Sequence, residues 1–231
     1  MTNPITIILI TAGTTPERTE YAVRTIRAAK RYLVYNPGLQ WFIADDGSKP
    51  DHIDAIRNEI SDCYAVGLWS EHNSYGRSCN EAIHKTRECG ELMFFLEDDW
   101  ELLYPLDLWP YADLLHEDTS VGMVRLGYLN AGVKGETFGH LGSLYWRLSC
   151  ESPYIFTGHP SLRHMRFHDH AGEYTERLQP GETELAMAWK YKTSPDPRPS
   201  IVWPCMMGQN GYFAHIGSVQ SYAWNGNGVL V

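Results

Sequence analysis

The chain lacks the features that mark several large classes of protein. Its 231 residues contain no apolar run long enough to cross a membrane, and no basic segment precedes the apolar run of MTNPITIILITAG at the N-terminus. No stretch is of low complexity, and no internal repeat is present. We therefore expect neither a membrane span nor a signal peptide. We expect a single globular domain over residues 1–231, because no linker divides the chain.

Cysteine and positive charge are both scarce. The five cysteines are odd in number and no pair has CxxC spacing, which predicts reduced thiols and a cytoplasmic location. The formal net charge of −9 argues against a nucleic-acid backbone as the main partner, because phosphate binding needs clustered Lys and Arg. Aromatic residues are abundant instead. Eight Trp and fourteen Tyr favour a ligand groove as well as a well-filled core.

Apolar strands alternate with helices through the first hundred residues. The expected strands are residues 5–10, 41–48, 64–69 and 92–100, and the expected helices are residues 14–33, 51–60 and 76–89. Thr15 is the expected N-cap of the first helix, and Pro16 takes its first helical position. This alternation predicts an α/β fold with a mostly parallel, doubly wound sheet.

The second half of the chain is less regular. Its expected strands are residues 121–128, 142–149, 154–159, 201–205 and 211–217, and its expected helices are residues 105–117 and 181–192. Residues 194–200 form a Pro-rich turn.

Two acidic turns directly follow apolar strands. Asp45 and Asp46 end the second strand, and Glu97, Asp98 and Asp99 end the fourth. Ligands of an open parallel sheet bind at the carboxyl ends of its strands, so these carboxylates are expected to share one cleft. Clustered carboxylates call for a divalent cation such as Mg²⁺, Mn²⁺ or Ca²⁺. The alternative is a pair of solvated turns in which Asp45 or Asp46 caps the next helix.

The ordered segments ADDGS, NSYGRSCNEA and FFLEDDW resemble the nucleotide-binding half of family 2 glycosyltransferases, which have the GT-A fold. The resemblance implies a GT-A-type, Rossmann-like single domain with a mostly parallel mixed central sheet flanked by helices. Residues 1–100 would form its nucleotide-binding half and residues 101–231 its acceptor-side half. It implies a metal-dependent, inverting glycosyltransferase that moves a sugar from a nucleoside diphosphate, most commonly UDP, to an acceptor hydroxyl. The cofactor would be Mn²⁺ or Mg²⁺.

The resemblance also implies roles for individual residues. The nucleotide-binding residues would be Thr11, Ala12, Arg18, Asp45, Arg77, Asn80, Glu97 and Asp98. Asp99 would be the direct metal ligand. Glu97 stands where the family more often has Asp, which leaves open how Glu97 and Asp98 divide their roles.

His215 is the hypothesised second ligand of the metal ion, because several similar enzymes supply a C-terminal histidine to it. Ligation needs a neutral imidazole, so activity is expected to fall below about pH 6.5. The alternative is a core or turn histidine that bonds to the backbone.

A transferase also needs a base to take the proton of the acceptor hydroxyl. The family supplies it from an acidic pair near a helix start, and the counterpart here is Glu182, with Glu184 two residues on. Pro180 and Gly181 break the chain and place Glu182 in the first turn. The alternative is a carboxylate that only complements the helix dipole. Thr183 stands where an acid is expected, so Glu182 and Glu184 both remain candidates.

The segment FTGHPSLRHMRFHDH is expected on the acceptor side, because family members often have a GHPSL-like turn there. Its four histidines leave a zinc site as an alternative, although their spacing matches no helical or zinc-finger pattern. They are His159, His164, His168 and His170. Arg163 and Arg166 fit a diphosphate or an anionic acceptor, or else a solvated helix face.

The sequence leaves the acceptor and two other functions open. The acceptor could be a glycan, a lipid-linked sugar, a protein side chain or a modified nucleobase. A sugar-phosphate nucleotidylyltransferase would need a Gly-rich, basic phosphate loop after the first strand, where TAGTTPER has one Gly and one Arg. A domain that binds nucleotide sugars or glycans without turnover is the other alternative. Acidic residues are present after the second strand, in the triplet after the fourth strand and at the start of the helix at residues 181–192, which argues against this alternative.

Overall fold

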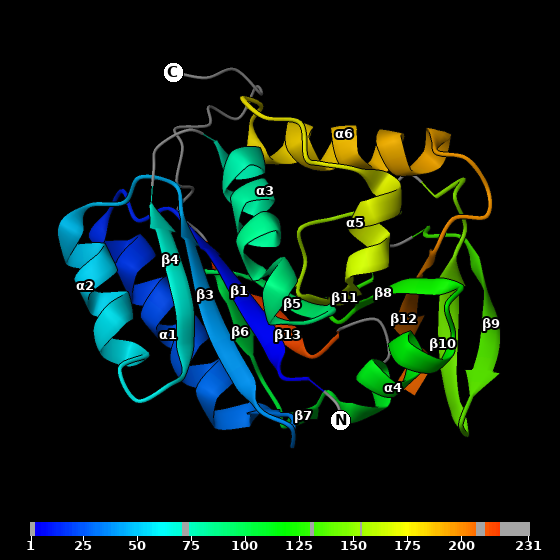
Figure 1. Cartoon of the computed structure of the whole chain (residues 1–231), viewed down its shortest axis with the longest axis horizontal. Helices are drawn as coiled ribbons and strands as arrows, with labels where there is room; N and C mark the ends of the chain where they lie inside the picture. The colour runs from blue at the N-terminus through cyan, green and yellow to red at the C-terminus, as the bar shows by residue number, and fades with distance from the viewer. Residues whose placement is uncertain (1–2, 71–73, 130–131, 153, 207–210, 218–231) are drawn as a thin grey trace.

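A computed structural model describes residues 3–70, 74–129, 132–152, 154–206 and 211–217. A mixed sheet of nine strands runs through the molecule in the order β4-β3-β1-β5-β11-β8-β12-β10-β9 (Figure 1). Its strands are β1 (Ile5–Thr11), β3 (Leu39–Asp45), β4 (Ala65–Ser70), β5 (Leu92–Glu97), β8 (Val121–Arg125), β9 (Gly135–His140), β10 (Ser143–Leu148), β11 (Ser161–His164) and β12 (Ser200–Pro204).

The helices and two small sheets complete the fold. The helices are α1 (Pro16–Tyr32), α2 (Pro50–Glu59), α3 (Tyr75–Thr86), α4 (Trp109–Glu117), α5 (Met165–Ala171), α6 (Pro180–Thr193) and the 3₁₀ turn η1 (Arg87–Cys89). The small sheets pair β2 (Leu33–Val34) with β7 (Leu106–Asp107), and β6 (Trp100–Leu102) with β13 (Phe213–His215).

The sheet is mostly parallel but mixed, as expected. Strands β4, β3, β1 and β5 pair in parallel, and β8 pairs in parallel with β12. Strand β11 is antiparallel to both of its neighbours, and β9 and β10 form an antiparallel hairpin at the far edge. The alternating first half of the sequence therefore forms four parallel strands, and the irregular second half supplies all of the antiparallel pairings together with the parallel pair β8 and β12.

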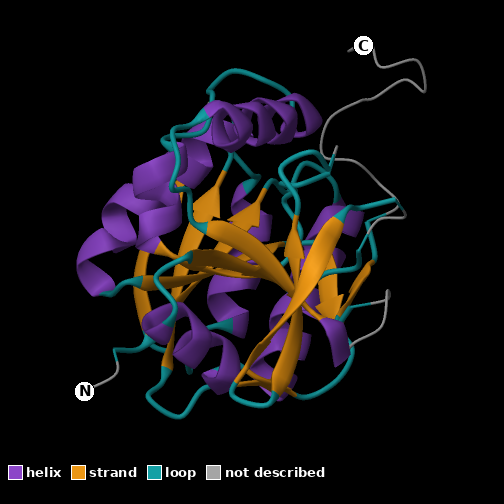
Figure 2. Ribbon diagram, turned by 90° about the vertical axis from the view of Figure 1, so that its right-hand side faces the viewer, coloured by secondary structure: helices purple, strands orange, loops and turns teal. Residues whose placement is uncertain are grey.

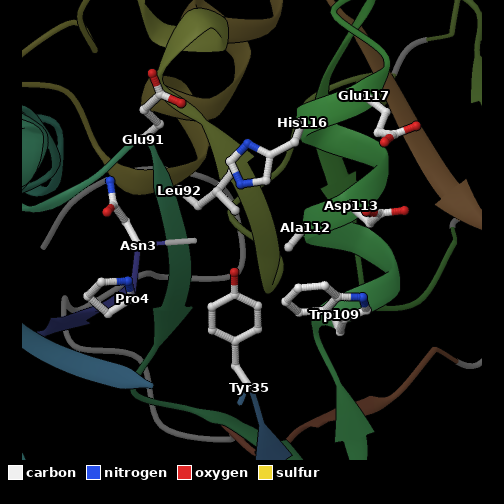
Figure 3. A pocket seen from close by; sticks show the side chains of 10 residues that line it. All are labelled: Asn3, Pro4, Tyr35, Glu91, Leu92, Trp109, Ala112, Asp113, His116 and Glu117. Carbon is white, nitrogen blue, oxygen red and sulfur yellow. The ribbon is translucent and has the colours of Figure 1, made fainter. Parts of the chain in front are cut away.

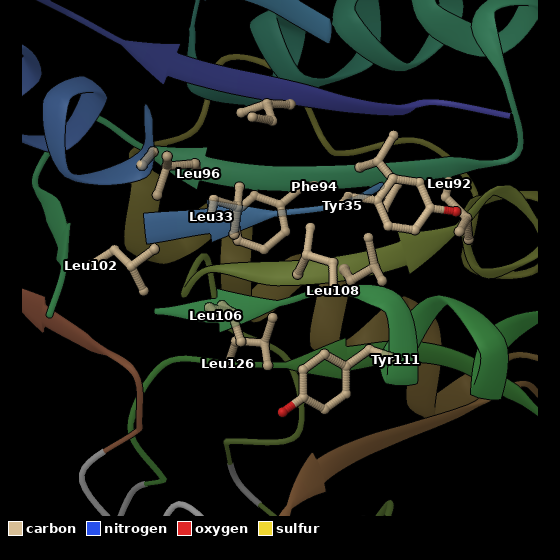
Figure 4. Packing of buried hydrophobic residues seen from close by; sticks show 14 of the residues in the cluster. Leu33, Tyr35, Leu92, Phe94, Leu96, Leu102, Leu106, Leu108, Tyr111 and Leu126 are labelled. Carbon is tan, nitrogen blue, oxygen red and sulfur yellow. The ribbon is translucent and has the colours of Figure 1, made fainter. Parts of the chain in front are cut away.

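Apolar residues on both faces of β1 explain why helices cover the sheet on two sides (Figure 2). Ile7 and Leu9 pack in one core with residues of α1, α2 and α4. Ile8 and Ile10 pack in the other core with residues of α3, α5 and α6. Figure 4 shows part of the first core, in which residues of β5 lie together with residues of β2, β6, β7 and the start of α4. Burying each such side chain contributes about 1.5–3 kcal/mol, so the two cores are the main source of stability.

The helix starts follow the expected chemistry. Thr15 caps α1 by accepting the N–H of Arg18 at 3.4 Å, and Pro16 takes the first helical position. Helix α4 starts at Trp109 rather than at residue 105, because Leu106 and Asp107 pair with β2 as a short strand.

The expected strand at residues 154–159 is wrong. Ile155 and Phe156 are buried, but they pack as a loop, and the sheet strand β11 begins only at Ser161. The guanidinium of Arg125 donates to the Tyr154 carbonyl at 2.8 Å, which satisfies one backbone oxygen of this loop. Strands β9 and β11 and helix α5 were not predicted. The expected strand 92–100 is divided at Asp98 and Asp99 into β5 and β6.

Membrane-spanning helices and disulfides are absent from the described ranges. No helix there is both long and apolar enough to cross a bilayer. All five cysteines are free thiols.

His168 is a buried imidazole on α5. It is 5% exposed, and within the described ranges neither ring nitrogen has a hydrogen-bond partner. The rings of Phe95, Phe167 and Tyr174 surround it. Burial, with the nearby charge of Arg163, holds its pKa well below the usual value, so it is neutral at pH 7.

We expect His168→Leu to raise the free energy of unfolding at pH 7 by about 1–3 kcal/mol, the usual cost of a buried polar group without a partner. The imidazole takes up a proton on unfolding below about pH 6.5, so the wild type loses stability as pH falls through that value, and the variant should lose less. Urea unfolding at pH 7 and pH 5.5 measures both effects. The control is His84→Leu, an exposed site expected to change stability by less than about 0.5 kcal/mol. A clearly destabilised His168→Leu would contradict this account.

Candidate functional site

Three parallel strands end side by side at one edge of the sheet. Thr11 at the end of β1 lies opposite Asp45 of β3, and Ile10 lies opposite Glu97 of β5. Asp45 is fully buried, and its carboxylate accepts the N–H of Ser48 at 3.1 Å and 3.2 Å. The two acidic turns thus lie on either side of β1, as the parallel topology predicts.

Asp98 is fixed by the end of β1 and the start of α1. The Thr11 hydroxyl donates to its Oδ2 at 2.6 Å, and the N–H of Ala12 donates to the same oxygen at 3.3 Å. Arg18 makes an ion pair with Oδ1. Burial raises the pKa of Asp98 to about 6, although Arg18 lowers it. Thr11, Ala12 and Arg18 therefore hold the acidic triplet in this structure.

His52 extends this network and was missed in the sequence. The Thr11 hydroxyl gives its proton to Asp98, so Thr11 Oγ1 accepts from His52 Nε2 at 2.7 Å. His52 Nδ1 then accepts from the Thr19 hydroxyl at 2.9 Å. Burial lowers the pKa of His52 to about 4, which keeps the ring neutral. No local pattern marks His52, because its partners lie on other elements.

Asp99 is the member of the triplet whose pKa is lowered. Its Oδ2 accepts from Arg18 at 2.8 Å and lies 3.3 Å from His215 Nε2, whereas its buried Oδ1 has no hydrogen-bond partner in the described part of the chain. Burial alone would raise the pKa of Asp99, but the hydrogen bond with His215 and the charge of Arg18 lower it. Asp99 in turn raises the pKa of His215. A Cβ at Gly217 would overlap Asp99, so this close approach requires glycine.

Glu97 lies against a different set of residues. Its Oε1 accepts the Tyr75 hydroxyl at 2.7 Å. Glu184 of α6 approaches the same place and accepts the N–H of Gly158. A Cβ on Gly158 would overlap Glu97 Oε1 and would lie 2.8 Å from Glu184 Oε1. The missing side chain at Gly158 therefore lets two carboxylates from distant segments come together.

Burial and mutual repulsion shift both carboxyl groups. Burial, with the negative charges of Asp99 and Glu184, holds the pKa of Glu97 well above its usual value. Burial also raises the pKa of Glu184, while the Gly158 N–H and the charges of Arg125 and Arg163 oppose that rise. Arg125 and Arg163 are both fully buried. Their positive charges partly offset the unfavourable burial of the Glu184 carboxylate.

The structure separates the two candidate bases on α6. Glu182 is exposed and closes a capping box, in which its Oε2 accepts the N–H of Gln179 at 3.2 Å. Glu184 follows two residues later, about 200° around the helix, and lies at the carboxylate pair. Of the two, only Glu184 is close to Glu97.

Arg77 and Asn80 on α3 lie in different settings. The Arg77 side chain is 38% exposed, with loose ion pairs to Glu81 and Glu176 at 3.6 Å and 3.8 Å. Asn80 is 4% exposed and brackets the backbone of Tyr174, accepting its N–H at 2.8 Å and donating to its carbonyl at 3.1 Å. In this structure Asn80 fixes the loop before α6.

The four histidines of residues 159–170 do not form one cluster. His159 lies near the acidic triplet, His168 is in the core, and His170 bonds Ser194 Oγ at 2.8 Å. His164 Nε2 lies 3.5 Å from Glu91.

The two arginines of the same segment are not on a solvated helix face. Arg163 is a buried residue of β11, and its guanidinium carbon lies 3.8 Å from the centre of the Phe95 ring. Arg166 donates to the carbonyls of Leu115 and Val121 at 2.7 Å and 2.8 Å.

An aromatic wall flanks Asp99. It consists of Trp100, Tyr128, His159 and His215. The Trp100 ring centre lies 4.7 Å from that of His159 and 5.1 Å from that of His215. Burial lowers the pKa of His159 to about 3, so its ring is neutral. Tyr128 and His215 are both exposed, so they form the accessible part of this wall.

Comparisons with known proteins give structural matches alone. No family model and no curated protein matches the chain. TarS 1–349 of S. aureus in complex with UDP has a TM-score of 0.64 at 13% identity, over 91% of this chain and 59% of that one. The same protein in complex with UDP-GlcNAc has a TM-score of 0.62 at 12% identity, over 95% of this chain and 62% of that one.

A third match is the mannosyltransferase PcManGT from Pyrobaculum calidifontis, in complex with GDP-Man and Mn²⁺. Its TM-score is 0.53 at 15% identity, over 92% of this chain and 59% of that one. This chain therefore spans about three-fifths of the length of all three structures. The likeness confirms the GT-A-type fold expected from the sequence.

Proposed function

We propose that the protein is a glycosyltransferase that moves a sugar from a nucleoside-diphosphate donor to an acceptor hydroxyl. One observation carries this proposal. Glu97, Asp99 and Glu184 gather with Arg18 and His215 at the carboxyl edge of the parallel strands. The fold is shared with structures that hold UDP, UDP-GlcNAc and GDP-Man. UDP is the first donor nucleotide to test, and a cytoplasmic location remains our expectation.

The residues around Asp99 fit a divalent cation, Mn²⁺ or Mg²⁺. Asp99 Oδ1 is a buried acceptor without a partner in the described ranges, and His215 lies beside the same carboxylate. Imidazole favours Mn²⁺, the ion held by the PcManGT complex. Asp99 and His215 would hold the ion, which when bound would stabilise negative charge on the departing diphosphate. Arg18 supplies a fixed positive charge at the same place.

Glu184 is the proposed general base. Burial raises the pKa of Glu184 toward neutral pH. A carboxylate whose pKa lies closer to the working pH is a more effective general base. Burial and the negative charges of Asp99 and Glu184 hold the pKa of Glu97 well above its usual value, so we propose that Glu97 stays protonated beside Tyr75 and leaves the pair with one negative charge. A single base acting in one displacement would invert the sugar, as the family resemblance implies. The exposed Tyr128 ring offers an apolar face for a sugar.

His215→Ala is expected to weaken Mn²⁺-dependent binding of UDP by about tenfold or more, because the ion would lose one of two protein ligands. Calorimetric titration of UDP with and without Mn²⁺ measures this. His84→Ala removes an exposed imidazole elsewhere and should change nothing. Equal Mn²⁺-dependent affinity in His215→Ala and the wild type would rule out the ligand role.

Turnover of UDP-GlcNAc, UDP-glucose and GDP-mannose with Mn²⁺ tests the proposed function. We expect release of nucleoside diphosphate from at least one donor, and hydrolysis without an acceptor would suffice. Formation of nucleoside triphosphate on adding pyrophosphate would instead indicate a nucleotidylyltransferase. Binding of donors without any release would indicate a domain without turnover. The acceptor, whether glycan, lipid-linked sugar, protein side chain or modified nucleobase, can be screened once the donor is known.

A further inference from the structure

A cavity of about 340 Å³ lies at the end of β5 opposite to the candidate active site (Figure 3). Glu91 and Leu92 line it at the start of the strand, whereas Glu97 ends the strand at the active site. At about 3.3 Å per residue, the two ends are roughly 17–20 Å apart. The cavity is therefore separate from the proposed transferase site, and its volume suits a small molecule or one side chain.

Helix α4 builds one side of the cavity. Five of its residues lie on one face, at spacings of three and four: Trp109, Ala112, Asp113, His116 and Glu117. Ala112 and Leu92 are 2% and 3% exposed and form an apolar floor. Figure 3 shows the His116 ring directed toward Leu92 and Glu91, and Asp113 and Glu117 also line the cavity from α4.

Tyr35 points a buried hydroxyl into this space. The residue is 5% exposed, and its hydroxyl has no hydrogen-bond partner in the described part of the chain. Its ring stacks on Trp109 with centres 6.0 Å apart, and Figure 3 shows the oxygen directed into the cavity. A buried hydroxyl without a hydrogen-bond partner is destabilising. A ligand that bonds this oxygen would remove that cost.

The charge around the cavity is negative. The carboxylates of Glu91, Asp113 and Glu117 line it with one imidazole, that of His116, and no Lys or Arg is among its described lining residues. Within the described ranges, Asp113 and Glu117 form no ion pair, and Glu91 pairs with the neutral His164 alone. Arg166 lies near enough to Glu91 to interact with its charge, but no Lys or Arg is among the described lining residues, so three carboxylates disfavour an anionic ligand and favour a cation.

A metal ion is the first cation to consider, because ligand atoms of Glu91, His116 and His164 lie within 4.8 Å of one another. However, His164 Nδ1 accepts the N–H of Arg166 at 3.1 Å and caps α5. The proton of the neutral ring is therefore on Nε2, which faces Glu91 at 3.5 Å. A protonated nitrogen cannot ligate a metal. The stacked rings of Tyr35 and Trp109 suit an organic cation instead.

We propose that this cavity binds a ligand with a primary ammonium group beside a compact apolar or sugar face. Asp113 and Glu117, with Glu91, attract the ammonium. The rings of Trp109 and Tyr35 contact the face of the ligand, and the Tyr35 hydroxyl accepts one of its hydrogen bonds. An amino sugar and a short diamine share this chemistry.

Calorimetric titration of the full chain with glucosamine, putrescine, glucose and Zn²⁺ tests the proposal. We expect glucosamine, putrescine or both to bind, and glucose, which lacks the ammonium, to bind at least tenfold more weakly. Tyr35→Phe removes one oxygen and Glu117→Gln one charge, and each should weaken amine binding about fivefold or more. Glu151→Gln removes the same charge from an exposed site remote from the cavity and should leave binding unchanged.

Several results would overturn the proposal. Absence of amine binding would do so, as would glucose binding as tightly as glucosamine. Binding of Zn²⁺ that is lost in His116→Ala, without amine binding, would show a metal site instead. Amine binding unchanged in both Tyr35→Phe and Glu117→Gln, with normal melting temperatures, would place the amine elsewhere. Donor turnover should be normal in these variants, so failure here is distinguishable from failure of the proposed transferase.

Discussion

Glu184→Gln is expected to lower the turnover number by about 10²- to 10⁴-fold, the range for loss of a general acid–base group. Glutamine has nearly the same shape, and its amide oxygen can still accept the Gly158 N–H, so the local structure should persist. It cannot take a proton from an acceptor hydroxyl. Donor affinity should stay within about twofold of the wild type, because Glu184 is proposed to act on the acceptor. Initial rates of nucleoside-diphosphate release with acceptor present measure the effect.

Glu182→Gln is the matched control for this experiment. It makes the same change two residues away, where the carboxylate only closes the capping box of α6. Glutamine can also fill that role, so turnover should stay within about twofold. A large loss in Glu182→Gln with normal turnover in Glu184→Gln would show that the base has been assigned to the wrong residue.

Asp99→Ala is expected to weaken Mn²⁺-dependent binding of UDP by about 100-fold or more. The variant removes the one carboxylate with a free buried oxygen in the described ranges, and it removes the partner of His215. The fold should remain, because Arg18 keeps its ion pair with Asp98. Titration of UDP with and without Mn²⁺ gives the affinities, and far-ultraviolet circular dichroism checks folding.

Asp54→Ala controls for the loss of one negative charge, because Asp54 is exposed and has only a 3.8 Å ion pair with Arg57. Its Mn²⁺-dependent UDP affinity should equal that of the wild type. An Asp99→Ala protein that is folded and binds UDP with unchanged Mn²⁺ dependence would remove Asp99 from the site.

The sequence predicts which edge of the sheet carries the acidic residues, but not which partner each of these residues contacts. Alternating strands and helices place the ends of β1, β3 and β5 together, which brings both acidic turns to one edge. The partners of the triplet come from distant positions: Thr11 for Asp98, Tyr75 for Glu97 and His215 for Asp99. Only tertiary packing decides which carboxylate meets which partner, so no spacing rule could have assigned them.

The second half was harder to predict because its polar residues are buried. Arg125 and Arg163 have the charge of surface residues, but both are fully buried near carboxylates and aromatic rings. Their charges interact with Glu184, and they bond Tyr154, Ser161 and Tyr174, partners from segments that are far apart in the chain. The sequence also could not decide which of Glu182 and Glu184 faces the site, because the rotation of α6 about its axis is set by packing.

A crystal structure of the protein with UDP and Mn²⁺ tests the central claim most directly. The account predicts the cation at Asp99 and His215, the diphosphate beside Arg18, and Glu184 on the open side of the donor site. Nucleotide bound elsewhere, for example in the cavity beside Tyr35 and Trp109, with Asp99 still held by Arg18 and no cation beside it, would contradict the account.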